Sequence, residues 1–463
     1  MGTSAELKQQ DNLFIHPWDD IVKLGGNERT LLSKGEGVYV YDSEGNRLLD
    51  APAGMWCVNI GHGREEMAQA IYDQVMALTY VSPWSFGTGP ASLFAAEIVE
   101  QAPGDLNHVF FTTCGSTAVD SALRFMQFYN NTRGKPNKKH IISLQRGYHG
   151  STYLGGSVSG KERDKGNMDC EEEFVHHIPA PHPLLKPAAQ SDAEFLDACV
   201  GNLENMIAEV GAENCAIFVA EPILASGGVI VPPEGYHQRC LEVCRKHDML
   251  YLSDEVVTGF GRLGHCFASE AVFGIQPDMI TTAKGLTSGY IPMGAFLVSD
   301  RLVQEIKDLG GDSAVFSNGF TYSGHPVAAA AGRKNLEIMQ RENLFEQVRE
   351  TGPYLQQQMQ KLLDIPIVRD VRGLGLVACV ECELKQGDDD LAMDYELGNR
   401  IDKHCQALGL LVRPMINMCV MSPPLTITRE QIDEMVSILR QGIELTMQDC
   451  INEGIWTPEK QAV

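Results

Sequence analysis

Four polar positions in this sequence stand where short apolar runs end, and their residue types could do chemistry together. They are Lys284, Asp254, Glu221 and the Gly-Ser-Thr sequence at 115–117. A lysine that is partly removed from water has a lowered pKa and can act as a nucleophilic amine that forms a Schiff base. A lone lysine at a strand end more often reaches its charge out to solvent, so the hypothesis depends on the other groups lying nearby.

Asp254 ends the run "MLYLSD" thirty residues before Lys284 (284 minus 254), which leaves room for one crossover between two strands of a sheet. A carboxylate there can pair with the protonated ring nitrogen of pyridoxal phosphate and make that ring a better electron sink. The ordinary alternative for Asp254 is a helix cap or a structural ion pair.

The stretch "TTCGSTAVDSALRF" predicts a helix that begins directly after a strand. Free backbone N–H groups at its start, together with the hydroxyls of Ser116 and Thr117, would form a phosphate site. Serine and threonine cap helices in many proteins, so this motif has little weight by itself. Tyr148, in "RGYHGSTYLGG", is an aromatic residue that could stack on a cofactor ring or simply pack in the core.

Apolar runs of four to eight residues alternate with amphipathic helical patterns from about residue 105, which is typical of buried, mostly parallel strands covered by helices. The runs are "HVFFTTC", "HIISLQ", "CAIFVAEP", "MLYLSDEV", "DMITTAK" and "GAFLVSD". The predicted fold class is therefore α/β, with a doubly wound sheet in a large domain. In such a sheet ligands bind beyond the carboxyl ends of the strands, where the four polar positions lie.

The two ends of the chain have a different pattern of predicted strands and helices. "GVYVYDSEGNRLLDAPAGMW" predicts a hairpin that turns at "SEGN", and "REEMAQAIYDQVMAL" predicts a helix. After residue 325 we expect two helices interrupted at "TGP" (351–353), then a smaller α+β region. The predicted division is an N-terminal segment at 1–60 that packs with the small domain, a large domain at 61–325 and a small domain at 326–463.

The composition excludes some classes of function. The 463 residues carry 37 basic and 61 acidic side chains, a net charge of −24, which argues against nucleic-acid or anionic-membrane partners. The N-terminus has no apolar core of a signal peptide, and the thirteen cysteines suit reduced thiols, so we expect a cytoplasmic protein. "CVEC" (Cys379, Cys382) could be half of a zinc site, but no second pair follows, and no metal is expected.

Five blocks of the sequence, taken together, resemble one known family. They are "YLSDEVVTGFGRLG", "ITTAKG", "GYHG", "AEPILASGGVIVPP" and "GFTYSGHPVAAAA". The chain is similar to class III aminotransferases of fold type I, and especially to the ω-amino acid:pyruvate group. The resemblance spans nearly the whole chain. It implies a large domain with a mostly parallel sheet, a smaller α+β domain, pyridoxal 5'-phosphate as cofactor, and a homodimer with shared active sites.

The resemblance also assigns roles to single residues. Lys284, Asp254 and Tyr148 would be catalytic, with Lys284 bonding the cofactor and transferring protons. Residues assigned to the cofactor are Gly115, Ser116, Thr117, Tyr148, His149, Glu221, Asp254, Val256, Lys284 and, from the partner subunit, Thr321. Residues assigned to the substrate are Trp18, Trp56, Trp84, Ala225, Phe320 and Arg413. Arg413 lies nine residues before Ser422 (422 minus 413), the spacing of the family's mobile carboxylate-binding arginine.

Two departures from the family pattern affect these expectations. Thr117 and Val119 replace a glutamate and an asparagine of the phosphate loop, and Pro83 and Trp84 replace paired phenylalanines. The expected function is transfer of an amino group from an ω-amino acid or amine (taurine, β-alanine or diamine type) to pyruvate by a ping-pong mechanism. The alternatives are a decarboxylase or an aminomutase on the same scaffold, or a catalytically silent binding protein.

Overall fold

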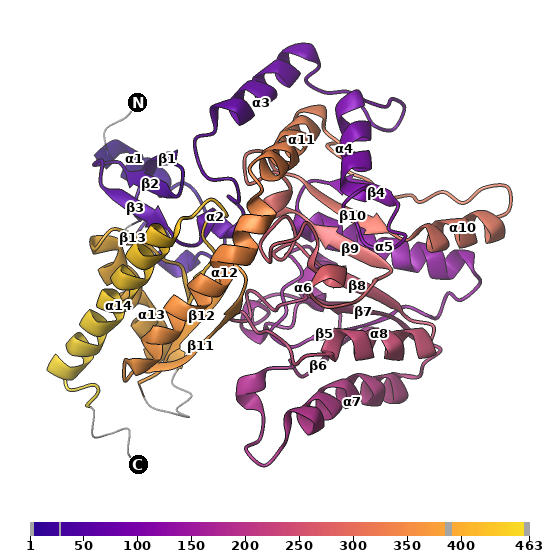
Figure 1. Cartoon of the computed structure of the whole chain (residues 1–463). Helices are drawn as coiled ribbons and strands as arrows, with labels where there is room; N and C mark the ends of the chain where they lie inside the picture. Colours follow the sequence, from indigo (N-terminus) through magenta and orange to yellow (C-terminus); the bar gives the residue numbers. More distant parts are fainter. Residues whose placement is uncertain (1–3, 27–28, 385–390, 458–463) are drawn as a thin grey trace.

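A seven-stranded sheet forms the centre of the protein in the computed structural model, which describes residues 4–26, 29–384 and 391–457 (Figure 1). In spatial order its strands are β4 (His108–Thr112), β10 (Gly294–Val298), β9 (Met279–Thr282), β8 (Leu250–Asp254), β7 (Cys215–Ala220), β5 (His140–Leu144) and β6 (Val175–Ile178). The six apolar runs of the sequence are six of these strands.

Five neighbouring strands, from β9 to β6, run parallel, whereas β10 is antiparallel to both β9 and β4. The sheet is therefore mostly parallel, as predicted. Strands β8 and β9 are direct neighbours, so one crossover does connect Asp254 to the Lys284 turn. Strand β6 was not predicted, because its sequence "VHHI" places two histidines in a run of only four residues.

Helices cover both faces of this sheet, and alternate residues of each strand point to opposite faces. Phe218 and Ala220 of β7 pack with α7 (Asp192–Val210) and α8 (Tyr236–Lys246). Ile217 and Val219 pack on the other side with α5 (Gly115–Thr132). Because both faces are buried, most of the central strands are mainly apolar runs in the sequence.

A second sheet, fully antiparallel, lies in the smaller domain. Its strands, in order, are β11 (Val368–Leu374), β12 (Val377–Cys382), β15 (Met418–Met421) and β14 (Pro414–Met415), and its helices are α12 (Leu344–Gln360), α13 (Leu391–Ala407) and α14 (Arg429–Asn452). Helix α11 (Pro326–Arg341) precedes α12 and packs on α3 (Glu65–Ala77) and α4 (Gly89–Val99) of the large domain.

The predicted helix break at "TGP" was wrong. Helix α12 continues through Pro353, and the interruption lies earlier, at Asn343, whose φ of 53° separates α11 from α12. Proline removes one backbone hydrogen bond from a helix. Here buried residues on both sides of Pro353, among them Val348 and Leu355, pack against the core and hold the helix together.

The N-terminal hairpin is present as predicted, with β2 (Tyr39–Asp42) antiparallel to β3 (Arg47–Asp50). It forms a sheet with β1 (Leu32–Glu36) and with β13 (Leu410–Leu411), so the start of the chain pairs with a strand from its last quarter. The predicted domain boundaries at residues 60 and 325 stay a prediction. The other elements are α1 (Ser4–Asp11), η1 (Ile21–Lys23), α2 (Ala53–Trp56), α3 (Glu65–Ala77), α4 (Gly89–Val99), α6 (Tyr153–Val158), η2 (Glu162–Asp164), η3 (Pro183–Leu185), α9 (Ala268–Ala271), η4 (Lys284–Leu286), α10 (Asp300–Leu309) and η5 (Lys361–Asp364).

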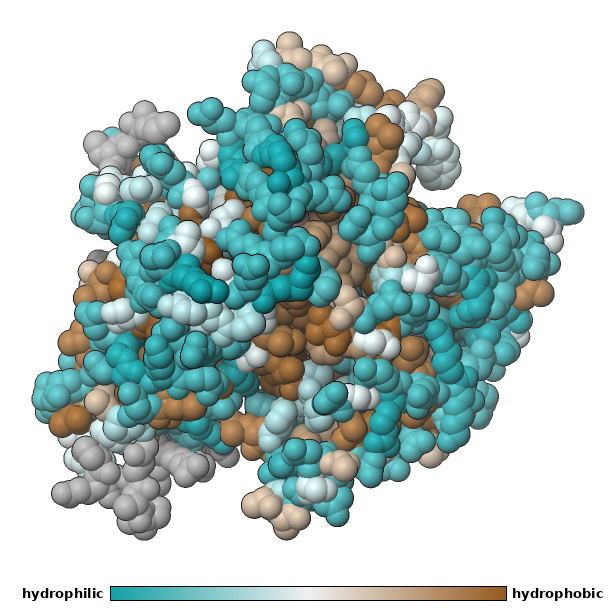
Figure 2. All heavy atoms as spheres, in the orientation of Figure 1, coloured by the Kyte–Doolittle hydropathy of each residue, from teal (hydrophilic) through white to brown (hydrophobic). Residues whose placement is uncertain are grey.

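One face of the molecule is mainly hydrophilic (Figure 2). Figure 2 shows polar side chains over most of the face in view, with hydrophobic ones gathered in a hollow between α12 and the central sheet. Within the described part of the chain, none of the helices is both long and apolar enough to cross a membrane.

Candidate active site

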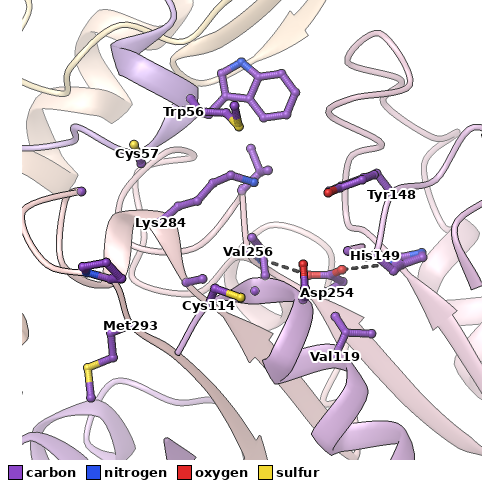
Figure 3. A pocket seen from close by; sticks show the side chains of 18 of the residues that line it. Trp56, Cys57, Cys114, Val119, Tyr148, His149, Asp254, Val256, Lys284 and Met293 are labelled. Carbon is purple, nitrogen blue, oxygen red and sulfur yellow. Dashed lines mark hydrogen bonds and ion pairs between the residues drawn. The ribbon is translucent and has the colours of Figure 1, made fainter. Parts of the chain in front are cut away.

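A cavity of about 390 Å³ lies beyond the carboxyl ends of the central strands (Figure 3). We call it the inner chamber. The expected site residues that line it are Trp18, Trp56, Gly115, Ser116, Tyr148, His149, Glu221, Asp254, Val256 and Lys284. These residues come from segments that are far apart in the sequence, and the fold brings them around one space.

Lys284 is the first residue of η4 and lies in a strained turn shortly after β9. Its φ of 46° is in the left-handed region, which side chains other than glycine rarely adopt. The turn is held from outside, because Asn335 donates hydrogen bonds to the carbonyl oxygens of Gly285 (2.7 Å) and Leu286 (3.2 Å). Gly285 is required here: a Cβ atom at this position would lie 2.4 Å from Nδ2 of Asn59.

This turn directs the Lys284 side chain into the inner chamber, between Trp56 and Val256 and toward Tyr148 (Figure 3). Its Nζ lies 5.4 Å from the centre of the Trp56 ring. Burial lowers the pKa of Lys284 below its usual value, although the charges of Asp254 and Glu221 act in the opposite direction. A lowered pKa makes the neutral, nucleophilic form of the amine more accessible.

Asp254 ends β8 at the floor of the chamber and is only 4% exposed. Its Oδ2 atom is hydrogen-bonded to Nδ1 of His149 at 2.7 Å. Its Oδ1 atom accepts from the hydroxyl of Thr281 (3.0 Å) and from the N–H of Val256 (3.2 Å). A carboxylate has about four acceptor positions. Three are used by the protein, which leaves room for one further donor from the chamber.

His149 is also buried, and its two ring nitrogens differ. Nδ1 bonds Asp254, while Nε2 has no hydrogen-bond partner among the described residues. Burial lowers the pKa of His149, but the hydrogen bond and charge of Asp254 outweigh burial, so the net direction is upward. A buried polar atom without a partner is uncommon, and because His149 lines the chamber, its Nε2 is available to a bound group.

The start of helix α5 forms another wall of the chamber. Its first N–H groups, at Gly115 and Ser116, have no acceptor within the helix. The loop after Tyr148 is pressed against this end, because a Cβ atom on Gly150 would lie 2.6 Å from Cα of Ser116. The N–H of Ser151 also donates to the Ser116 hydroxyl at 3.1 Å. The arrangement leaves a helix N-terminus beside the chamber, where an anionic group binds favourably.

Thr117 does not line the chamber. Its hydroxyl accepts from the N–H of Cys114 at 3.0 Å and donates to the Cys114 carbonyl oxygen at 2.9 Å. Thr117 therefore caps the helix in place of the glutamate expected from the family pattern, since an acceptor three residues after the N-cap satisfies the same N–H group.

Glu221 links two loops at the chamber wall. Its carboxylate accepts from the N–H of Tyr148 (2.9 Å) and from the N–H of Ala225 (3.0 Å). Burial raises the pKa of Glu221. Ala225 is itself buried in a cluster with Trp56 and does not line the chamber. Its backbone, rather than its methyl group, contributes to the site.

A second cavity of about 500 Å³, which we call the outer chamber, adjoins the inner one. The two share Trp18, Met55, Trp56, Tyr148, Ser226 and Lys284. Arg413 lines the outer chamber, with its guanidinium carbon 5.9 Å from the ring centre of Trp18 and 5.7 Å from that of Trp56. Burial and the nearby Arg163 lower the pKa of Arg413.

Besides Thr117 and Ala225, three expected residues line neither chamber of this single chain: Trp84, Phe320 and Thr321. Trp84 is 94% exposed, and Thr321 is also on the surface. The two segments lie side by side, since the hydroxyl of Tyr80 donates to the carbonyl oxygen of Thr321 at 2.6 Å. Their assigned roles stay predictions.

Several chamber residues were not expected from the sequence. Cys57 and Met293 line the inner chamber, while Lys161, Arg163 and Asp164 line the outer one. The last three belong to the charged stretch "GKERDKG", which reads as an exposed loop. No pattern in the sequence distinguishes such a loop from one that turns into a cavity.

The inner chamber fits pyridoxal phosphate. Asp254 has one acceptor position left, which matches a protonated ring nitrogen, and the start of α5 suits a phosphate group. Lys284 provides an amine of lowered pKa between them. Among the described residues there is no group of three or more metal-ligating side chains.

Comparisons with known proteins agree with this chemistry. The sequence profile described as "Aminotransferase class-III" matches residues 24–443. The putrescine–pyruvate aminotransferase of Pseudomonas aeruginosa is 42% identical over 451 residues, covering 96% of this chain and 98% of the relative. A thermostable (S)-enantioselective omega-transaminase from Thermomicrobium roseum has a TM-score of 0.90 at 36% identity and covers 97% and 99% of the two chains. An omega-transaminase from Pseudomonas jessenii in complex with PMP has a TM-score of 0.90 at 33% identity, covering 96% and 98%. With the profile and these relatives spanning nearly its whole length, the chain belongs to the class III aminotransferases, which use pyridoxal phosphate on a fold type I scaffold.

Proposed function

We propose that this protein is a transaminase that moves an amino group from an amine or ω-amino acid to pyruvate, giving alanine. The observation that carries this proposal is the meeting of Lys284 and Asp254, at the ends of the neighbouring strands β8 and β9, in one chamber. The name of the P. aeruginosa relative supports pyruvate as acceptor and a diamine as one type of donor. Taurine-type and β-alanine-type donors fit the family as well.

Pyridoxal phosphate, when bound, supplies an electron sink that stabilises charge on the carbon next to the transferred nitrogen. Asp254 would bind its ring nitrogen, and the start of α5 would bind its phosphate. Lys284 Nζ would hold the cofactor between turnovers. As a free amine, the same Nζ would act as the base and acid that moves a proton between the substrate and the cofactor. The Lys284 turn keeps this nitrogen in place for both transfers.

Four further chamber residues would orient the reacting groups. Tyr148 lies across the chamber from Val256, so we assign to these side chains the two faces of the cofactor ring. We assign to Glu221 the side of the ring that carries its hydroxyl, and to Trp56 a wall of the substrate site. Tyr148 is fixed by the bond from its N–H to Glu221.

We further propose a homodimer in which each subunit completes the site of the other. Thr321 would reach the partner's phosphate site, and Phe320 and Trp84 would line the partner's substrate pocket. The exposure of Trp84 (94%) and of Tyr322 (59%), on adjoining segments of one surface, supports this proposal, because contiguous exposed apolar groups mark interaction sites. The thirteen free cysteines support a cytoplasmic location.

The direct test is to trap the cofactor. Borohydride treatment of the purified protein should bleach its yellow colour and leave the cofactor covalently attached to Lys284, as identified by mass spectrometry of peptides. Lys284→Ala should still bind the cofactor and lose steady-state transamination. Attachment at another lysine would refute the assignment. Release of carbon dioxide, or turnover without an amino acceptor, would indicate a decarboxylase or an aminomutase instead.

A further inference from the structure

The outer chamber has an excess of positive charge once its ion pairs are counted. Its two acidic side chains, Asp19 and Asp164, are both engaged. Asp19 accepts from Arg29 at 2.7 Å, and Asp164 accepts from Arg163 at 3.0 Å. Within each pair the arginine and the aspartate neutralise each other. The net charge of the chamber is therefore set by the basic groups that remain.

Three basic side chains remain in this chamber: Lys284, which is assigned to the cofactor, Lys161 and Arg413. The side chains of Lys161 and Arg413 have no ion pair or hydrogen bond with any residue that the structure describes, and both are half-buried. Each lies over aromatic rings instead: Lys161 Nζ is 5.5 Å from the ring centre of Tyr148, and Arg413 is over Trp18 and Trp56. Cation–π contacts offset only part of the cost of removing these charges from water.

The electrostatics of the chamber agree with this geometry. Burial and the charge of Arg163 lower the pKa of Lys161 to about 8, and Arg413 contributes to this lowering. Burial and the charge of Arg163 also lower the pKa of Arg413. An anion bound beside these two half-buried cations would favour the charged form of both.

We propose that Lys161 is a specificity-determining residue that binds an acid group at the distal end of a substrate whose other end reacts at Lys284. Arg413 serves the carboxylate next to the reacting carbon, and Lys161 serves a second, distant one. The substrates concerned are ω-amino acid donors and dicarboxylic 2-oxo acid acceptors. This inference rests on the proposed transaminase function and adds to it a residue that discriminates by charge.

The shape of the site supports a distal role for Lys161. Lys284 lines both chambers, whereas Lys161 lines only the outer one. Tyr148 adjoins both lysines: the Lys284 side chain points toward it (Figure 3), and Lys161 Nζ lies over its ring. A substrate that reaches from Lys284 along Tyr148 brings its far end to Lys161.

The test compares the Lys161→Gln holoenzyme with the wild-type holoenzyme at pH 7. It uses pairs of substrates that differ in the distal group. The donors are 4-aminobutyrate and butylamine, and the acceptors are 2-oxoglutarate and pyruvate. Loss of a charge-assisted hydrogen bond should lower kcat/KM about tenfold for 4-aminobutyrate or 2-oxoglutarate, and about twofold or less for butylamine and pyruvate. For putrescine, whose distal group is an ammonium, kcat/KM should rise, because a repelling charge is removed.

Two control variants separate charge recognition from other effects. Lys161→Arg should keep the preference for acid-tailed substrates. Lys246→Gln changes the net charge equally but lies on the exposed surface of α8 outside the chambers, so it should have no effect. Binding of glutarate, measured by calorimetry, should weaken about tenfold in Lys161→Gln only. This measurement does not depend on turnover.

Equal losses for all substrates in Lys161→Gln, with an altered cofactor spectrum, would show that Lys161 only supports Tyr148, and would overturn the inference. Unchanged glutarate binding would overturn it too. If the wild type transaminates none of these donors but glutarate binding still depends on Lys161, then the proposed function fails while the anion site stands. The two failures are therefore distinguishable.

Discussion

The carboxylate of Asp254 and the imidazole of His149 share a hydrogen bond of 2.7 Å, and both side chains are almost fully removed from solvent. The pair comes from β8 and from the loop after β5, which are far apart in the sequence. Because the Asp254 charge favours the protonated imidazole, the pKa of His149 is raised in the folded protein. The pair therefore links protonation to folding.

We expect this link to appear as a pH-dependent stability. A raised pKa means that the stabilisation is fully present below the unfolded value, about 6.5, and is lost as the pH rises through the folded value. The difference in the free energy of unfolding between wild-type apoprotein and Asp254→Asn should therefore be larger at pH 6 than at pH 9. Urea denaturation at both pH values measures it. A difference that is constant or grows with pH would contradict the assigned protonation.

Gly285→Ala should damage catalysis more than stability of the fold. The new Cβ atom would lie 2.4 Å from Nδ2 of Asn59 and 2.9 Å from Cβ of Phe260, both buried, so the Lys284 turn must move. A displacement of about 1 Å at a reacting group can cost about 10²-fold in rate, and we expect a fall in kcat of that order. Gly201→Ala, on α7 with no atom within 4 Å of the new Cβ, is the matched control. Equal activity of the two variants would show that the turn tolerates the shift.

Arg413→Ala should impair the pyruvate half-reaction far more than the half-reaction of an uncharged amine. A hydrogen bond to a charged group is worth roughly 1.5–3 kcal/mol, so the pyruvate rate constant should fall about 10- to 100-fold. Stopped-flow absorbance follows each half-reaction separately. Arg413→Lys keeps the charge but loses the planar fork, and should give an intermediate loss. Similar losses in both half-reactions would exclude Arg413 as the carboxylate-binding residue.

Thr321→Ala should weaken cofactor binding without changing the chemistry of the remaining holoenzyme. If the Thr321 hydroxyl of one subunit binds the phosphate in the other, its loss costs roughly 1.5–3 kcal/mol of cofactor affinity. Thr321→Ser keeps the hydroxyl and should retain the affinity, as measured by titration of the apoprotein. A monomer that is active at assay concentration, as seen by light scattering, would refute the shared site.

Strand ends were the most predictable part of the site. Asp254 and Lys284 follow runs that are buried on both faces, and such runs are continuous enough to recognise in the sequence. The errors arose where packing overrides local preference. Pro353 normally ends a helix, yet the buried residues around it keep α12 intact. Strand β6 contains two histidines in four residues, and its pairing with β5, not its composition, makes it a strand.

The sequence by itself determined the family, the mostly parallel sheet and the residue types that can bind and activate the cofactor, because these are written in local patterns and motifs. Only the tertiary structure decided the backbone conformation and the interaction partners of those groups. The φ of 46° at Lys284 depends on contacts with Asn335, about fifty positions away in the chain. The unpaired state of the Lys161 side chain depends on Asp164 being engaged by Arg163. Such properties depend on residues that are close in space but distant in the sequence. The pKa of a side chain and its partners are fixed only when the chain has packed around it.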